Sequence, residues 1–386
     1  MLTHPFGPDT RGTPLWDTGH RSRLPALEGD VDTDVCVVGL GGSGLSCVRE
    51  LRRLGVRVVA LEAGEVGGGA AGRNGGFLLA GLAPFYHEAI ARYGRERARQ
   101  LYRLTLREID RIEADTPSLV SRSGSLRIAE SEEELLDCEL QLAAMRADGL
   151  PAEWYDGVEG RGLLVPGDGT FQPLARCREL AARAVEEGAL LFECSPMTRV
   201  DADSGAVHTA HGRVHCQAAI IAVDGNLERL LPELRSRVRT ARLQMLATEP
   251  TAEIQVRRPV YARWGYDYWQ QRPDGAIALG GARDLAGDSE WTAEATPTSV
   301  VQRALERRLR EQLGVTAPIT HRWAASVGYT HDGLPIVEEV RRNVWAIGAY
   351  SGTGNVIGAL LGRGMAHWLV SGEDALVRPF RDDRVV

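Results

Sequence analysis

The chain of 386 residues contains no lysine, so all 45 of its basic residues are arginine. Its six cysteines show no CxxC spacing, which argues against a zinc site or a redox-active pair. No apolar run approaches the roughly 20 residues needed to span a bilayer, and the first residues lack the pattern of a secretory signal. The formal net charge of -7 gives no electrostatic case for binding nucleic acid or an anionic membrane. We therefore expect a cytoplasmic protein with reduced thiols that acts on a small molecule.

A glycine-rich turn follows a short apolar strand at 34–38. The turn contains Gly39, Gly41, Gly42, Ser43 and Gly44. In such a GxGxxG turn, the first glycine permits the tight turn and the second lets the backbone approach a pyrophosphate. The third glycine lets the following helix, expected over 45–54, pack closely on the sheet. Because unpaired N–H groups at a helix N-terminus favour negative charge, the pattern predicts a bound dinucleotide.

A second strand, expected over 56–61, leads into Glu62 and Ala63. A carboxylate at this distance from the glycines can accept hydrogen bonds from both ribose hydroxyls and would repel a 2'-phosphate. NAD and FAD both satisfy this pattern. Since no second fingerprint of this kind is present, nothing indicates a separate nicotinamide site, and the electrons would have to come from the substrate.

A second glycine-rich run, 67–77, comes soon after Glu62. It contains Arg73, Asn74, Gly75 and Gly76, and such a run offers main-chain N–H groups to an extended ligand. The segment resembles the Gly-Ala-Ser-Gly-Arg-Asn-Gly-Gly motif of the D-amino-acid oxidase superfamily of FAD enzymes, which includes glycine, sarcosine and gamma-glutamylputrescine oxidases. Ala71 stands where that family often has serine. The resemblance implies that the dinucleotide is FAD.

The C-terminal part carries a second match to the same family. Residues 321–337 are similar to its Trp-x-Gly and Thr-x-Asp-Gly-x-Pro stretch, and 343–364 are similar to its strand, glycine turn and final helix. The turn includes Gly352, Thr353, Gly354 and Asn355. Thr353 stands in place of the usual histidine, which puts a proton-relay role at this position in doubt. In the family this helix end faces the flavin ring, where reduction develops negative charge.

The resemblance covers residues 30 to 372 and places two further segments at the cofactor. It puts the backbone around Met197 against the adenine and the turn at Gly225 near the cofactor. The apolar strand 218–223 before that turn fits any buried parallel strand equally well.

We expect an α/β fold, with a Rossmann-type FAD-binding domain and an inserted α+β substrate domain built on an antiparallel sheet. The FAD-binding domain would comprise 28–83, 161–238 and 323–386, and the substrate domain 84–160 and 239–322. Further helices are expected over 88–113, 131–148 and 299–313, with another helix opening at 168–173 and a strand at 188–193. Ser131 and Glu134 form a plausible capping box.

The segment 261–269 is interpreted as one strand. At a period of two, Trp264, Tyr266 and Tyr268 would share one face, and Arg263, Asp267 and Trp269 the other. The aromatic face could cap an amine by cation–π contact, or it could be ordinary sheet core. Arg263 and Arg283 could clamp a carboxylate, or they could be surface residues. The candidate substrate contacts are Tyr268, Tyr329 and Tyr350, with Arg263, Trp269 and Arg283.

The resemblance implies an enzyme that oxidises an amine or amino acid by hydride transfer to flavin N5. The resulting imine hydrolyses, and oxygen reoxidises the flavin to give hydrogen peroxide. Sarcosine-type oxidases use a lysine beside the flavin for the oxygen step, and the corresponding position here is Ala278. Those enzymes also attach FAD to a C-terminal cysteine, whereas the last cysteine here is Cys216, so FAD should be non-covalent.

Several alternatives stay open at this point. The enzyme could be a dehydrogenase that passes electrons to a quinone or a partner subunit, or it could oxidise a hydroxy acid. The chain could also be a non-catalytic FAD-holding subunit of a complex. Arg97, Arg103 and Arg107 could belong to a contact in a homo-oligomer, or they could simply be solvated. No residue has to be a general base.

Overall fold

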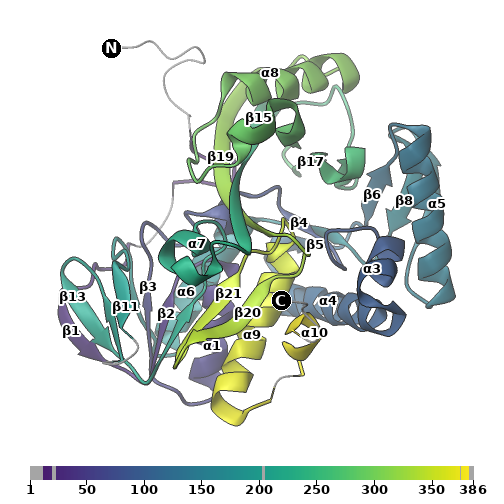
Figure 1. The fold of residues 1–386 in the computed structure, drawn as a ribbon. Coiled ribbons are helices and arrows are strands. Elements are labelled where there is room, and N and C mark those ends of the chain that lie inside the picture. The colour runs from purple at the N-terminus through teal and green to yellow at the C-terminus, as the bar shows by residue number, and fades with distance from the viewer. Residues whose placement is uncertain (1–11, 20–22, 202–204, 374, 382–386) are drawn as a thin grey trace.

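The computed structural model describes residues 12–19, 23–201, 205–373 and 375–381 (Figure 1). These residues form a mixed α/β fold that contains four sheets. Within these ranges, no helix has the length and apolar character needed to cross a membrane.

The first sheet is the Rossmann-type sheet, with the order β10-β3-β2-β14-β21-β20. All neighbours in it are parallel except β20 and β21. Its strands are β2 (Val35–Val38), β3 (Val58–Leu61), β10 (Leu190–Phe192), β14 (Ala218–Ile221), β20 (Ile336–Arg341) and β21 (Val344–Gly348). Every residue of β2, β3 and β14 is buried, as expected for strands that are covered on both faces.

Helices α1 (Gly42–Arg53), α6 (Pro173–Glu186) and α9 (Gly354–Ser371) pack together over one face of this sheet. The other face is covered by α7 (Leu227–Leu230) and a small sheet. That sheet consists of β1 (Gly29–Asp32), β13 (Gly212–His215), β12 (Ala206–His208) and β11 (Arg199–Asp201). The sheet core therefore lies between two apolar layers, which leaves the strand ends for a ligand.

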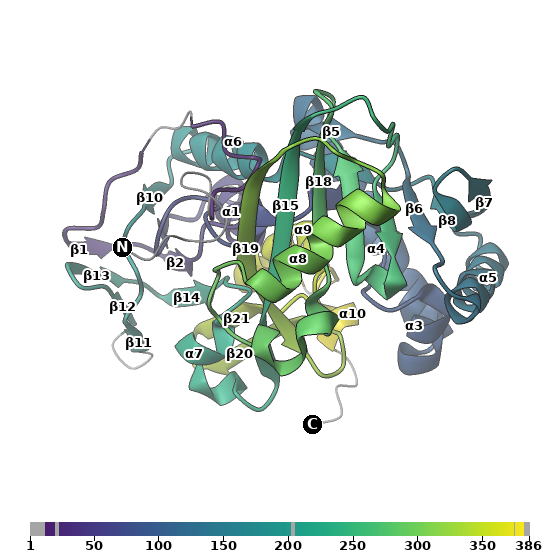
Figure 2. The ribbon, with the colours of Figure 1, turned by 90° about the horizontal axis from the view of Figure 1, so that it is seen from above.

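The largest sheet has eight strands in the order β19-β15-β18-β17-β16-β6-β8-β7. Its strands are β19 (Ile319–Thr330), β15 (Val238–Pro250), β18 (Ala276–Gly281), β17 (Asp267–Gln271), β16 (Val260–Ala262), β6 (Ser125–Ile128), β8 (Gly160–Val165) and β7 (Glu153–Gly157). Neighbours are antiparallel apart from β16 and β6. Helix α8 (Ser299–Arg307) lies over one face, as Figures 1 and 2 show. We call the opposite face, which carries Met245 and Trp323, the inner face.

The remaining elements surround these sheets. They are β4 (Phe77–Leu78), β9 (Gly169–Phe171), β5 (Val120–Ser121), α2 (Ala70–Arg73), α3 (Tyr86–Tyr93), α4 (Arg95–Asp115), α5 (Glu132–Ala147) and α10 (Arg378–Arg381). Strand β19 runs across the domain boundary expected between 322 and 323, and the division into domains stays a prediction.

Several expected helices have different bounds in the structure. The helix expected over 88–113 is two helices, α3 and α4, because Gly94 between them has a φ of +85°. Helix α8 ends at Arg307, and a short π-helix over Arg308–Gln312 follows it within the segment expected to be helical. Strand β9 occupies 169–171, so α6 begins only at Pro173. The Ser131 hydroxyl accepts the Glu134 N–H as the capping box predicted, at 3.1 Å.

The interpretation of 261–269 as one strand is wrong. The chain runs through β16, turns at Arg263–Gly265 and returns as β17, so Tyr261 pairs with Tyr268. Arg263, Trp264 and Gly265 all have positive φ values, of 53°, 53° and 85°. Because the chain reverses there, Trp264 does not share a strand face with Tyr268, and it is 43% exposed.

Candidate functional site

The glycine-rich turn after β2 leaves an open helix N-terminus. Gly39 has a φ of +103°, and a Cβ on it would lie 2.6 Å from the Ala222 carbonyl oxygen. A Cβ on Gly44 would collide with the Gly39 carbonyl, whereas one on Gly42 would meet no atom within 4 Å. Helix α1 has no side-chain cap and no acidic residue in its first turn. Its N–H groups are therefore available to an anionic group such as a pyrophosphate.

Glu62 lies at the end of β3, beside this turn. Its carboxylate accepts the N–H of Leu40 at 2.8 Å and that of Gly64 at 3.0 Å. Burial raises the pKa of Glu62, and the N–H groups of Gly64, Leu40 and Ala63 oppose that rise. A carboxylate has about four acceptor positions, so Glu62 keeps capacity for ribose hydroxyls.

The segment assigned to the adenine lies next to Glu62. The Ser195 N–H donates to the Glu62 carbonyl at 2.8 Å, and Met197 follows two residues later and is buried. Gly225 lies instead against β19, where a Cβ would come within 2.5 Å of the Ser326 carbonyl oxygen. Gly225 therefore has a packing reason to be glycine that does not involve a cofactor.

The guanidinium of Arg73 is bound by main-chain carbonyl groups. Its guanidinium donates to the carbonyl of Ala324 at 2.8 Å and to that of Gly12. Trp16, which is 2% exposed, donates from its indole to the carbonyl of Asn74 at 2.7 Å. The N-terminal segment 12–19 thus lies across the loop predicted to contact FAD. The sequence analysis missed this segment, and an isolated Leu-Trp pair in a polar stretch was its one signal.

The start of α9 meets the same loop. Asn74 accepts the N–H of Gly76 at 2.8 Å and the carboxamide N–H of Asn355 at 3.0 Å. Helix α9, like α1, has no side-chain cap and no acidic residue in its first turn. Thr353 uses its hydroxyl to donate to the Tyr350 carbonyl at 2.7 Å. Two uncapped helix N-termini and the Glu62 carboxylate, with its remaining acceptor capacity, fit an extended dinucleotide such as FAD.

Three aromatic rings form a wall on the inner face of the large sheet. The ring centroids of Tyr261 and Tyr268 are 5.8 Å apart. The ring centroid of Phe77, which begins β4, is 5.1 Å from that of Tyr261 and 6.1 Å from that of Tyr268. A Cβ on Gly75 would lie 3.2 Å from the Tyr268 ring. The wall formed by these three rings therefore lies directly beside the predicted flavin loop.

Tyr329 and Arg283 lie near this aromatic wall. A Cβ on Gly352 would lie 3.8 Å from the Tyr329 hydroxyl, so Tyr329 reaches the C-terminal glycine turn. The Arg283 guanidinium stacks 5.0 Å from the Tyr329 ring centroid and 4.9 Å from that of Trp291. No carboxylate in the described part of the chain forms an ion pair with Arg283, so this cation is available to a ligand.

The tyrosine hydroxyls of this region stay protonated at neutral pH. Burial raises the pKa of Tyr268 and Tyr329, and it raises the pKa of Tyr261 to about 12. These side chains can therefore donate hydrogen bonds to a substrate, but they are poor bases.

The other predicted substrate contacts lie away from this region. Tyr350 is buried between α1 and α9, with its ring against Gly354 and Gly358. Arg263 forms ion pairs with Asp267 at 2.9 Å and with Asp284. Trp269 faces α8, on the opposite side of the sheet from Tyr268, because neighbouring strand residues alternate between faces. Neighbouring residues account for the positions of Arg263 and Trp269 without a ligand.

Asp224 is a further polar residue that the sequence analysis did not single out. It follows β14 at the strand ends where open α/β sheets bind ligands, and its carboxylate accepts the N–H of Tyr350 at 2.9 Å. Burial raises its pKa to about 7. Its place directly after a buried apolar strand was the signal that could have identified it.

Comparisons with known proteins agree with this arrangement. The sequence model of the DAO family, described as FAD-dependent oxidoreductase, matches residues 34–368. Gamma-glutamylputrescine oxidoreductase of Escherichia coli (strain K12) is 28% identical over 367 residues, which cover 89% of this chain and 85% of that protein. The crystal structure of glycine oxidase from Geobacillus kaustophilus has a TM-score of 0.72 at 20% identity, covering 89% of this chain and 95% of the other. L-proline dehydrogenase from P. horikoshii has a TM-score of 0.73 at 17% identity, covering 92% and 98%.

The family match extends over most of the chain and includes both glycine-rich segments as well as the start of α9. The expected α/β fold and the expected FAD cofactor are thereby confirmed. The chain belongs to the DAO family of FAD-dependent oxidoreductases.

Proposed function

We propose that the protein oxidises a carbon–nitrogen bond of a small amine or amino acid, with non-covalently bound FAD. The observation that carries the proposal is the meeting of Tyr268, Tyr329 and Arg283 beside the glycine turns at Gly75 and Gly352. Aromatic rings, protonated hydroxyls and a cation without an acid partner among the described residues suit an amine that also carries a carboxylate. Relatives named for gamma-glutamylputrescine and glycine support this substrate class.

When bound, FAD would supply the redox chemistry, namely an acceptor for the hydride of the substrate carbon. The residues of the chain would position the substrate and exclude water. The aromatic wall consists of Phe77, Tyr261 and Tyr268. The hydroxyl of Tyr268 or Tyr329 can donate a hydrogen bond to the substrate. Arg283 would bind a carboxylate by its planar fork. The N-terminus of α9 would stabilise the negative charge that develops near it.

An anaerobic screen tests the proposal. The FAD-loaded protein is mixed with amines, amino acids and hydroxy acids, and the visible flavin absorption is followed. We expect at least one amine or amino acid to bleach the flavin, and Tyr268→Phe and Arg283→Met to slow this reaction. Arg303→Met is a matched control, because Arg303 is exposed on α8. Bleaching by hydroxy acids alone would contradict the proposal, and no bleaching by any compound would favour a non-catalytic FAD-holding subunit.

Oxygen is the proposed acceptor for the electrons, with hydrogen peroxide as the product. A dehydrogenase that uses a quinone or a partner subunit is a second candidate, and the environment of Ala278 favours it. Ala278 is fully buried and packs with Trp16, Met245 and Trp323. An uncharged side chain therefore stands at the position where the resemblance to sarcosine-type oxidases implies a lysine. Stopped-flow reoxidation by oxygen separates the two candidates.

The attachment of FAD, the oligomeric state and the cytoplasmic location stay predictions. Acid precipitation should release all the flavin into solution if FAD is non-covalent. Of the arginines suggested for a subunit contact, Arg97 donates to the Pro379 carbonyl at 2.7 Å within the same chain. Arg103 and Arg107 are exposed and stay candidates for such a contact.

A further inference from the structure

Arg127 places a cation on the inner face of the large sheet, and no acid in the described part of the chain forms an ion pair with it. It is half-buried on β6, and its guanidinium lies 5.1 Å from the ring centroid of Phe85. No hydrogen bond or ion pair joins this guanidinium to another side chain in the described ranges. Arg308, on the α8 side of the same sheet, shows the usual arrangement, with an ion pair to Asp267 at 2.8 Å. The lack of such a partner at Arg127 leaves all five of its N–H donors available.

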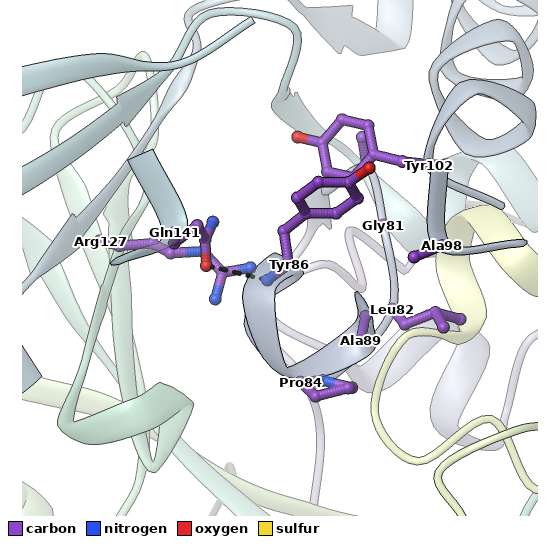
Figure 3. Close-up of a pocket in the computed structure, with 10 residues that line it drawn as sticks. Gly81, Leu82, Pro84, Tyr86, Ala89, Ala98, Tyr102, Arg127 and Gln141 are labelled. Atoms are coloured by element: carbon purple, nitrogen blue, oxygen red, sulfur yellow. Dashed lines mark hydrogen bonds between the residues drawn. The ribbon is translucent and has the colours of Figure 1, made fainter. Parts of the chain in front are cut away.

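The side chain of Arg127 borders a small pocket between β6 and helices α3, α4 and α5. Figure 3 shows Arg127 reaching from β6 toward the start of α3, with Gln141 beside it. Gln141 accepts the Tyr86 N–H at 3.3 Å, and its amide nitrogen contacts only the Met145 sulfur, at 3.5 Å. The pocket thus presents a guanidinium and a weakly engaged amide N–H, which are both hydrogen-bond donors.

Asp168 is an acid whose pKa responds to the charge of Arg127. Arg127 lowers the pKa of Asp168 through its charge, although burial raises that pKa more strongly. The two carboxylate oxygens of Asp168 are already bonded, one to the Ala80 N–H at 2.9 Å and one to the Ser125 hydroxyl at 2.6 Å. Asp168 therefore offsets part of the charge of Arg127 but does not occupy its hydrogen-bond donors.

Arg127 lies in line with the aromatic wall. It is the register partner of Tyr261, and Tyr261 is the register partner of Tyr268, so all three point to the inner face. Neighbouring strands are about 4.8 Å apart, which places Arg127 about 10 Å from Tyr268 along the sheet. This spacing along the sheet matches the length of a chain of several carbons.

We propose that Arg127, with Gln141, forms a distal subsite that binds a carboxylate at the far end of an amine substrate. The inference rests on the proposed function, and it narrows the substrate class to amines that carry a carboxylate several bonds from the reacting carbon. A planar guanidinium suits a carboxylate because it can donate two parallel hydrogen bonds. The adjacent Phe85 ring holds the guanidinium in one orientation.

Calorimetric binding tests the subsite without requiring turnover. The probes are β-alanine, γ-aminobutyrate, δ-aminovalerate and ε-aminocaproate, each compared with the alkylamine of the same length. The FAD-loaded wild type should bind at least one ω-amino acid about tenfold or more tightly than its alkylamine, the gain expected from one charge-assisted pair. Arg127→Met should remove this preference and leave alkylamine binding unchanged.

Two further variants make the test specific. Arg127→Lys keeps the charge but loses the planar guanidinium, so it should keep part of the preference for the ω-amino acid over its alkylamine. This variant also provides a second test if Arg127→Met fails to fold. Arg303→Met should behave like the wild type. The subsite is overturned if no ω-amino acid is preferred, or if the preference survives in Arg127→Met. If binding depends on Arg127 but no amine or amino acid bleaches the flavin, the proposed function is refuted and the subsite is not. If an amine or amino acid bleaches the flavin but its binding does not depend on Arg127, the subsite is refuted and the proposed function is not.

Discussion

Asn355 donates a hydrogen bond from its Nδ2 to the Oδ1 of Asn74 at 3.0 Å, although 281 residues separate the two. The same nitrogen donates to the Phe77 carbonyl at 2.8 Å. One carboxamide therefore joins the start of α9 to the glycine loop and to the main chain of Phe77, whose ring belongs to the aromatic wall. The two glycine-rich motifs, far apart in the chain, act as one structural unit through this contact.

Replacing Asn355 by aspartate should weaken FAD binding. The new carboxylate would face two oxygen acceptors in place of donating to them, so the loop and the start of α9 would separate. We expect a loss of about 1 to 3 kcal/mol in FAD affinity, measured by flavin fluorescence titration. Asn343→Asp is the matched control, because Asn343 is exposed in the turn between β20 and β21. Equal effects of the two substitutions would remove Asn355 from the cofactor site.

The fold of this region could be predicted from the sequence because its signals are steric and local. Gly44 must lack a Cβ since the Gly39 carbonyl is too close, and that requirement is visible as a motif. The start of α9 was expected from the resemblance of 343–364 to the family's glycine turn and final helix, and α9 begins at Gly354. What the sequence did not show was the hydrogen bond between Asn74 and Asn355, because nothing in a single sequence reports which distant polar groups pair.

Glu62→Gln should also lower FAD affinity. The carboxylate accepts the N–H groups of Leu40 and Gly64, and an amide can present only one oxygen to these donors and to the ribose. The expected loss is about 1 to 3 kcal/mol, read from the same titration. Glu133→Gln on the exposed side of α5 should have no effect. FAD affinity that is unchanged in Glu62→Gln would exclude Glu62 as the ribose acceptor.

Trp16 should stabilise the fold through its buried ring and the glycine-rich loop at Asn74 through its hydrogen bond. Trp16→Ala removes a buried ring, and we expect it to reduce the free energy of unfolding by about 3 to 5 kcal/mol. Trp16→Phe keeps most of the volume but loses the 2.7 Å hydrogen bond to the Asn74 carbonyl, so it should cost about 1 kcal/mol. Denaturation of the FAD-loaded protein measures both values. A Trp16→Ala variant as stable as wild type would show that the segment 12–19 does not pack there.

The substrate side was predicted less well because its geometry depends on a chain reversal. The alternation of aromatics over 261–269 looks the same in one strand as in a hairpin, and the turn depends on the left-handed conformations of Arg263 and Trp264, which are uncommon for such residues. Tyr268 nevertheless lies on the inner face. Its partner Tyr261 was missed, since cross-strand pairing depends on where the turn falls.

Asp168 should make stability depend on pH. Burial raises its pKa to about 6 in the folded state, from 3.8. The folded protein therefore holds this proton more tightly than the unfolded chain, so the group stabilises the fold below pH 3.8 and loses that effect as the pH rises through about 6. At 1.36 kcal/mol per pKa unit, the change is about 3 kcal/mol.

Asp168→Asn removes this titration and serves as the reference. The wild-type free energy of unfolding minus that of the variant should fall by about 3 kcal/mol between pH 3 and pH 7 and stay level above that range, as measured by urea denaturation. Taking the difference cancels the other carboxyl groups. A difference that does not change with pH would mean that Asp168 titrates normally in the folded protein.

The last prediction concerns Ala278, the position where sarcosine-type oxidases are expected to have lysine. Ala278 is 0% exposed, and Trp16, Leu174, Met245 and Trp323 pack around it. We expect Ala278→Lys to lower the free energy of unfolding by about 3 to 5 kcal/mol, because the ammonium would be buried without an acid partner. Ala278→Met is the control for size, and overpacking alone should cost it about 1 to 3 kcal/mol. If Ala278→Lys were as stable as the wild type and its flavin were reoxidised faster by oxygen, the side chain would have found space beside the cofactor. Ala278 would then limit the use of oxygen, and the dehydrogenase candidate would gain its strongest support.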